Sequence, residues 1–327
     1  MSDIEQLVAR FEAGDLLRPS CAVPNLVDLA RALAWLAGAQ HVELTDGAAR
    51  LAELIGPCDH LVCLLADGLG MNLVETLPSS AFLPRHLVAE LRTVFPSSTA
   101  VALTTLATGA WPNRHGVTGQ WTHLPEIRNA GALLPFTTRV GGQSLTTLGI
   151  TVEQAFLLPS LMCSARRDTL AVLPAPIADS LSSAYFCGRK ARRGYGTLAE
   201  ATDIIAARVR AAEAPSYTYL YTPRVDLEAH RFGVKGPGVQ AALLELEREL
   251  ERLAEGLHGR ARIVLTADHG LLDTPVAQRH LMRPTADLFD VLRFPPSGDA
   301  RVMYLHVRDG ARERMRRSFK ERYGDRF

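Results

Sequence analysis

The sequence has almost no excess of either charge, with 36 basic and 35 acidic residues and a net charge of +1. This balance argues against nucleic-acid polymers and anionic lipid surfaces as partners. No apolar run reaches the roughly 18 residues that a membrane span needs. The N-terminal stretch MSDIEQLVARFEAGDLL also lacks the basic region, apolar core and small-residue cleavage site of a secretory signal. We therefore expect a cytoplasmic protein, and the sequence leaves its oligomeric state open.

Cysteine is scarce, odd in number and never arranged as a CxxC pair. This pattern argues against a disulfide framework and against a thiolate zinc site. We expect most of the cysteines to be small buried apolar residues. They are Cys21, Cys58, Cys63, Cys163 and Cys187.

What the sequence does contain is an alternation of short apolar runs and amphipathic segments. HLVCLLADGLG begins with a run too short for a typical helix, which is typical of a buried parallel strand. We predict further strands in LRTVFP, SYTYLYTPRVD and ARIVLTADHG, and a helix in LLELERELERLAEGL before the last of these. The alternation predicts an α/β fold with a doubly wound, mostly parallel central sheet and helices on both faces.

The chain of 327 residues, 47% of them hydrophobic, is long enough for a large core. Residues 1–56 are typical of amphipathic helices, whereas residues 121–200 are irregular and rich in Gly, Pro, Ser and basic residues. We interpret residues 1–327 as a single domain, with 121–200 as a cap-like excursion within it.

Polar residues follow several of the predicted strands. Asp67 comes after LVCLLA, Asp226 after YTYLYTPRV, and Asp268 with His269 after IVLTA. Ligands of open α/β sheets bind outside the carboxyl ends of the strands, so these side chains are expected at one edge. In DLEAHRFG, Asp226 and His230 are four residues apart and would share one helix face. Carboxylates and imidazoles that converge in this way predict a site for two metal ions.

The stretch VFPSSTAVALTTLATG places a hydroxyl at the same edge. Its Ala-rich part predicts a helix that ends at Gly109, with Thr99 in the first turn, where free N–H groups favour an anion such as phosphate. The alternative is that Ser97, Ser98 and Thr99 only cap the helix. The later hydroxyls, those of Thr104, Thr105 and Thr108, are expected to bond to nearby carbonyls.

In their order along the chain, the motifs ADG, PSST with a following TG, PNRHG, DLEAHRFG and TADHG resemble those of the alkaline phosphatase superfamily. Over residues 58–285 the chain is most similar to the nucleotide pyrophosphatase/phosphodiesterase branch of that superfamily. The resemblance implies an alkaline phosphatase-like fold and zinc-dependent hydrolysis of a small phosphorylated substrate, with nucleotides among the candidates.

The resemblance also assigns roles to individual residues. It implies one zinc among Asp67, Thr99, Asp268 and His269, and a second zinc with Asp226 and His230 as ligands. It makes Thr99 the nucleophile, which forms a phospho-threonine that water then hydrolyses. A free threonine hydroxyl is a weak nucleophile, so activation by a metal agrees with this role.

The chain departs from the family pattern at two places. Where the family has an asparagine that binds a phosphoryl oxygen, HGVTGQW offers Gln120, which we predict to bind substrate instead. The family's third histidine on the second zinc, in a Gly-His-Gly-like segment, has no counterpart here. His280 and His306 are the remaining candidates, and both are more typical of structural histidines. We expect that a C-terminal segment of the family domain is absent; the alternative is a natural short form.

Two other functions stay open on the sequence. The chain could be a monoesterase or phosphomutase relative that uses Ser97 or Ser98, or a binding module that is inactive for want of a metal ligand. A sulfatase is disfavoured because its Cys- or Ser-x-Pro-x-Arg signature is missing.

Overall fold

The computed structural model describes residues 3–282 and 289–324. The α-helices are α1 (Asp3–Glu12), α2 (Leu26–Leu36), α3 (Asp46–Ile55), α4 (Met71–Val74), α5 (Phe82–Arg85), α6 (Thr99–Thr108), α7 (Pro112–His115), α8 (Val152–Ala155), α9 (Leu181–Phe186), α10 (Leu198–Ala211), α11 (Arg224–Phe232), α12 (Pro237–Leu257) and α13 (Arg312–Tyr323). The strands are β1 (His60–Ala66), β2 (Trp121–Leu124), β3 (Asn129–Ala132), β4 (Thr137–Thr138), β5 (Asp168–Pro174), β6 (Ala191–Tyr195), β7 (Ser216–Thr222), β8 (Ala261–Thr266), β9 (Ser297–Gly298) and β10 (Met303–Tyr304). Short 3-10 helices are η1 (Pro125–Ile127), η2 (Leu161–Ser164), η3 (Ala175–Ile177), η4 (Val276–Gln278) and η5 (Phe289–Val291).

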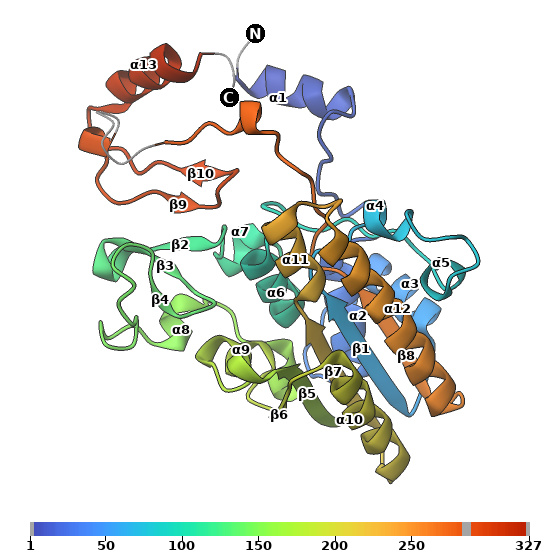
Figure 1. Ribbon diagram of the computed structural model, residues 1–327. Coiled ribbons are helices and arrows are strands. Elements are labelled where there is room, and N and C mark those ends of the chain that lie inside the picture. The colour runs from blue at the N-terminus through green and yellow to red at the C-terminus, as the bar shows by residue number, and fades with distance from the viewer. Residues whose placement is uncertain (1–2, 283–288, 325–327) are drawn as a thin grey trace.

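The central sheet is parallel, in the order β6-β5-β7-β1-β8 (Figure 1). β1 lies near its middle and is buried along its whole length, as its continuous apolar sequence predicts. Its register is set by pairs such as Leu65 with Tyr221 of β7 and Leu65 with Thr266 of β8. The predicted α/β class and parallel central sheet are therefore confirmed.

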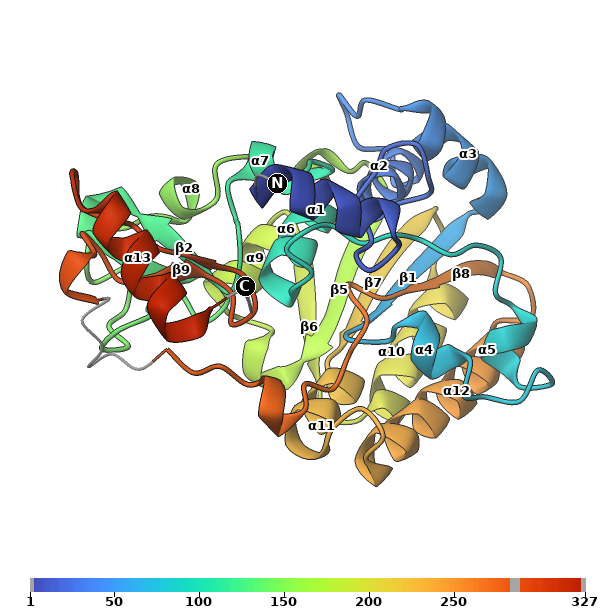
Figure 2. The same ribbon diagram turned by 90° about the horizontal axis from the view of Figure 1, so that it is seen from above.

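Alternate residues of β1 pack on opposite faces of the sheet. Leu61 and Cys63 belong to a core with α2, α3 and α6, whereas Val62 and Leu64 belong to a core with α10 and α12. Figure 2 shows the sheet between α2 and α3 on one side and α10 and α12 on the other. Both faces are thus covered, which is the arrangement predicted for a doubly wound fold.

One of the predicted strands is wrong. LRTVFP does not enter the sheet; only Arg92 pairs, through an isolated bridge to Asn25. The Arg92 amide donates to the Pro24 carbonyl, and the segment then runs through Pro96 to the start of α6. Val94 is buried in the core beneath α2, which accounts for the apolar pattern of this segment without a strand.

The segment 121–200 is less irregular than we expected. It contributes β5 and the edge strand β6 to the central sheet, and β6 includes the basic residues Arg192 and Arg193. Charged side chains are common on edge strands, where they discourage pairing with other chains. The same segment supplies β2, β3 and β4 to a second, antiparallel sheet of order β10-β9-β2-β3-β4, which also contains the late strands β9 and β10 (Figure 1).

The helices outside the central layers include α1 near the N-terminus and the arginine-rich α13. The first of these agrees with the helices expected in residues 1–56. Within residues 3–282 and 289–324, no helix is both long enough and apolar enough to cross a membrane.

Candidate metal centre

Asp67 lies directly after β1 at the carboxyl edge of the sheet, with only 2% of its surface exposed. Its amide donates to the Thr222 carbonyl and extends the ladder between β1 and β7. The chain then turns at Gly68, whose φ of +74° suits glycine. A Cβ at Gly68 would lie 3.1 Å from Cβ of Asp226, so this glycine allows α11 to approach the end of β1 closely.

Thr99 is the first residue of α6 and faces Asp67. Its hydroxyl oxygen lies 3.5 Å from each carboxylate oxygen of Asp67 and 3.2 Å from Nε2 of His269. Ser98 holds the N-cap position, yet its side chain makes no cap hydrogen bond. The hydroxyl of Thr99 therefore lies among polar side chains of the site, and the capping interpretation has no support in the geometry.

Asp268 and His269 follow β8 at the same edge. Asp268 is fully buried, and its Oδ1 accepts the amides of Gly68 and His269 at 3.0 and 2.9 Å. Nδ1 of His269 lies 3.0 Å from the Gly270 carbonyl, which can only accept, so Nδ1 carries the proton. Nε2 of His269 faces the site, 3.4 Å from Oδ2 of Asp268 and 3.6 Å from Oδ1 of Asp67.

Asp226 and His230 lie one turn apart on α11, and Nε2 of His230 is 3.2 Å from Oδ2 of Asp226. The predicted four-residue spacing on one helix face is therefore confirmed. The His230 side chain is 75% exposed, whereas Asp226 is buried. Asp226 projects into the site, and His230 lies at its rim.

The donor atoms of this centre could hold a cation. Ligand atoms of Asp67, Asp226 and His269 all lie within 4.8 Å of one another. Oδ1 of Asp226 and Oδ2 of Asp268 are buried and have no hydrogen-bond partner in the described part of the chain. Buried polar atoms without partners are costly, and a divalent cation would satisfy both oxygens. Carboxylates with a neutral imidazole are also the ligands that zinc accepts.

The electrostatics of the centre likewise favour a cation. Burial raises the pKa of Asp67 well above its ordinary value, and the charges of Asp268 and Asp226 raise this pKa further. Burial also raises the pKa of Asp226, against the opposing effect of His230 and His269. Closely spaced carboxylates are thus held where ionisation is unfavourable without a positive charge between them.

Sequence reasoning missed Tyr221, which donates a 2.6 Å hydrogen bond to Oδ2 of Asp67. The alternating tyrosines of β7 suggested only sheet packing. Tyr221 pairs with Leu65, two residues before Asp67, and this register brings its hydroxyl to the sheet edge. Thr93, in the segment mispredicted as a strand, is a second missed contact, since its hydroxyl donates to the Asp268 carbonyl.

The other predicted site residues lie elsewhere. Gln120 immediately precedes β2, and its backbone N–H donates to the carboxylate of Asp299. Its side chain forms no hydrogen bond to the metal-centre residues in the described ranges. His306 bonds to Ser297 Oγ at 2.8 Å and packs against the ring of His123. His280 is outside the group of clustered metal donors found in residues 3–282 and 289–324. A substrate role for Gln120 and the identity of a third histidine ligand stay predictions.

The remaining hydroxyls of α6 are structural. Thr104 and Thr108 donate to the carbonyls four residues earlier, at 2.7 Å, as predicted. Thr105 differs, because its hydroxyl pairs with Nε2 of His115 at 3.1 Å. Nδ1 of this fully buried histidine accepts the Val117 amide, so Nε2 must be the protonated nitrogen.

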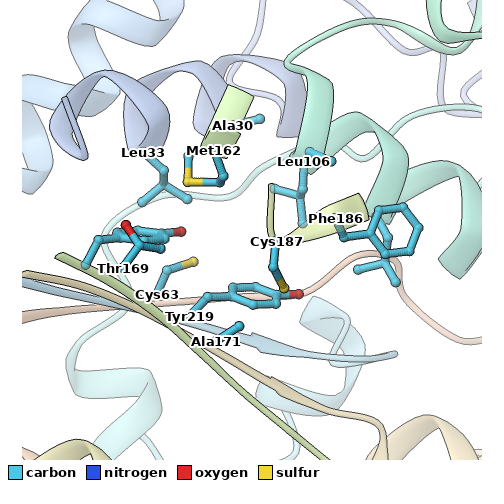
Figure 3. A pocket seen from close by; sticks show the side chains of 13 residues that line it. Ala30, Leu33, Cys63, Leu106, Met162, Thr169, Ala171, Phe186, Cys187 and Tyr219 are labelled. Carbon is cyan, nitrogen blue, oxygen red and sulfur yellow. The ribbon is translucent and has the colours of Figure 1, made fainter. Parts of the chain in front are cut away.

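A small cavity of about 50 Å³ lies between the central sheet and α2 and α6, away from the metal-centre residues. Figure 3 shows Cys63 and Cys187 among its mostly apolar lining side chains. Burial raises the pKa of each thiol to about 12, which makes them unreactive. Our expectation that most cysteines are buried holds only for this pair, since Cys21 and Cys163 are exposed and Cys58 is half-buried.

Comparisons with known proteins identify a family and a similar fold. A family model described as type I phosphodiesterase / nucleotide pyrophosphatase matches residues 61–139 and 159–323. The fold is similar to murine ectonucleotide pyrophosphatase / phosphodiesterase 5, with a TM-score of 0.55 and 16% identity over 79% of this chain and 69% of that one. An inactive form of the same murine protein in complex with AMP gives a TM-score of 0.55 and 15% identity, over 79% and 68% of the two chains. No curated protein sequence matches the chain.

Proposed function

The chain belongs to the type I phosphodiesterase / nucleotide pyrophosphatase family, and we propose that it hydrolyses phosphodiester or pyrophosphate bonds with Thr99 as the nucleophile. One observation carries this proposal. The Thr99 hydroxyl lies at the N-terminus of α6, 3.2 Å from Nε2 of His269 and 3.5 Å from the carboxylate of Asp67. A hydroxyl placed there can bind the same cation as these side chains and meet a phosphoryl group at the helix start.

We propose that the centre holds two divalent cations, both zinc. Asp67, Thr99, Asp268 and His269 would hold one of them, and Asp226 with His230 would hold the other. When bound, these cations supply Lewis acidity, which lowers the pKa of a coordinated hydroxyl and stabilises negative charge on phosphoryl and leaving oxygens. The buried, unpartnered oxygens of Asp226 and Asp268 support this assignment.

Thr99 acts in two steps of the proposed reaction. Its hydroxyl loses a proton to water, and its oxygen then bonds to phosphorus as the bond from phosphorus to the leaving oxygen breaks. The electron pair of the broken bond stays on the leaving oxygen, which takes a proton from water. A water molecule then attacks the phospho-threonine, the bond from phosphorus to Thr99 breaks, and Thr99 regains its proton. The free N–H groups at the start of α6 stabilise negative charge in both steps.

The substrate that we propose is a small phosphorylated molecule of the nucleotide class. The murine protein of similar fold has been obtained in complex with AMP, which motivates nucleotides as the first compounds to test. We further propose that Gln120 contacts the substrate and that the protein acts in the cytoplasm.

A substrate panel tests the reaction class. The chain, supplied with Zn²⁺, is assayed on bis-nitrophenyl phosphate, nitrophenyl phosphate and a dinucleotide. We expect faster turnover of the diester and the dinucleotide than of the monoester, and loss of turnover on chelation. A monoester preference would favour the phosphatase or phosphomutase alternative. No turnover of any member by the zinc-loaded chain would favour the inactive binding module.

A further inference from the structure

Tyr221 makes the shortest contact that any described residue makes with the carboxylate of Asp67. Its hydroxyl donates to Oδ2 at 2.6 Å, whereas Thr99 and His269 approach the same carboxylate no closer than 3.5 Å. A neutral phenol has a single proton to donate, so its acceptor here is fixed. One lone pair of Asp67 Oδ2 therefore accepts the Tyr221 hydroxyl, and Oδ1 is the oxygen that lies nearest His269.

Tyr221 is itself firmly held. Its ring is buried in the same apolar cluster as Leu65 and Leu103, and its backbone carbonyl accepts the hydroxyl of Tyr195 at 2.9 Å. It is also anchored in β7 by its pairing with Leu65 of β1. A buried aromatic ring on a central strand has little freedom to move, so the position of its hydroxyl is determined by the fold.

We propose that Tyr221 is a positioning residue that orients Asp67 within the metal centre. By bonding to Oδ2, it leaves Oδ1 facing His269 and stops the carboxylate from rotating about its χ2 torsion. This inference rests on the proposed metal-dependent function, since Asp67 must be a ligand for its orientation to matter. Hydrogen bonds from neighbouring side chains to a liganding carboxylate fix its geometry and raise metal affinity.

Co²⁺ binding to the metal-free chain tests the proposal without any activity measurement. Co²⁺ is titrated into the wild type, Tyr221→Phe and Tyr217→Phe, and the visible absorption spectrum and the bound metal after equilibrium dialysis are recorded. Tyr217→Phe is a matched control, because it removes a buried hydroxyl from the same strand whose partner is Cys63. We expect Tyr221→Phe to weaken Co²⁺ binding by about 10- to 100-fold and to alter the spectrum, and Tyr217→Phe to do neither.

A second variant keeps the test decisive if Tyr221→Phe folds poorly. Replacing Tyr221 with 4-aminophenylalanine keeps an N–H donor near the position of the hydroxyl, and we expect it to restore both affinity and spectrum. Binding and spectrum unchanged in folded Tyr221→Phe would overturn the role of Tyr221 while leaving the metal centre intact. Loss of binding in the folded 4-aminophenylalanine variant would overturn it as well. If the wild type binds no Co²⁺, the proposed metal centre itself fails, and the role of Tyr221 fails with it.

Discussion

The hydroxyl oxygen of Thr99 lies 3.2 Å from Nε2 of His269, although 170 positions of the chain separate the two residues. The start of α6 and the end of β8 meet at the carboxyl edge of the sheet (Figure 1). Because Nδ1 of His269 contacts the Gly270 carbonyl, Nε2 is the nitrogen that faces the threonine. The contact thus joins the proposed nucleophile to a proposed metal ligand.

Replacing the proposed nucleophile should abolish turnover and spare the fold. We expect Thr99→Ala to lower the hydrolysis rate of bis-nitrophenyl phosphate by more than about 10³-fold, because the attacking oxygen is removed. Thr99→Ser should retain appreciable activity, since its hydroxyl can occupy the same position. The free energy of unfolding should change by less than about 1 kcal/mol, because Ser98 and not Thr99 holds the N-cap position.

Ser98→Ala is the matched control for that experiment, since it removes the neighbouring hydroxyl from the same helix start. We expect it to keep near wild-type turnover. A Thr99→Ala variant as active as the wild type, or a Ser98→Ala variant without activity, would assign the attack to another group.

The two halves of the metal centre should hold their ions with unequal strength. In the proposed assignment, Asp226 and the 75% exposed His230 would offer two protein ligands to one ion, whereas the buried Asp67, Asp268 and His269 would bind the other together with the Thr99 hydroxyl. Fewer and more exposed ligands bind more weakly. Metal analysis after timed dialysis against a mild chelator should show one ion lost well before the other. Equal retention of both would point to a further ligand such as His280.

Gly68 should be essential for the approach of α11 to the end of β1. A Cβ there would lie 3.1 Å from Cβ of Asp226 and 2.9 Å from Cδ1 of Leu271, and the φ of +74° disfavours alanine by about 1–2 kcal/mol. We therefore expect Gly68→Ala to lower the free energy of unfolding, measured in urea, and to reduce bound metal per chain. Gly256→Ala, with open space around it near the end of α12, should be neutral or stabilising by up to about 1 kcal/mol. Unchanged metal content in Gly68→Ala would argue against this packing constraint.

His115 should make the protein less stable as the pH falls. Burial lowers its pKa from the ordinary 6.5 to about 4, so below pH 6.5 the unfolded chain binds this proton more readily than the folded chain. Stability attributable to His115 should be constant above about pH 6.5 and decrease as the pH falls towards 4, by at most about 3 kcal/mol. Urea unfolding of the wild type and His115→Asn at pH 7.0, 5.5 and 4.5 measures this. The stability advantage of the wild type should shrink with acid, and a constant difference would contradict the prediction.

The sequence by itself determined the parts of this protein that depend on local pattern. The apolar runs before Asp67, Asp226 and Asp268 form the strands β1, β7 and β8 of the central sheet, as their local pattern predicts, and the acids that follow them lie at its carboxyl edge. The start of α6 at Thr99 and its end at Gly109 likewise follow from local helix signals, and Gly109 adopts the left-handed conformation that ends such a helix.

Only the tertiary structure decided which distant segments meet. The apolar pattern of LRTVFP fits a strand as well as a buried irregular segment, and contacts with Asn25 and the core beneath α2 settled the choice. The basic segment β6 forms a strand because it pairs in parallel with β5, and this pairing cannot be read from the local sequence of β6. The hydrogen bond from Tyr221 to Asp67 depends on the register of β7 against β1. Strand order and register arise from pairing between segments far apart in sequence. Because the pairing energy depends on both segments, the sequence of either one alone does not predict it.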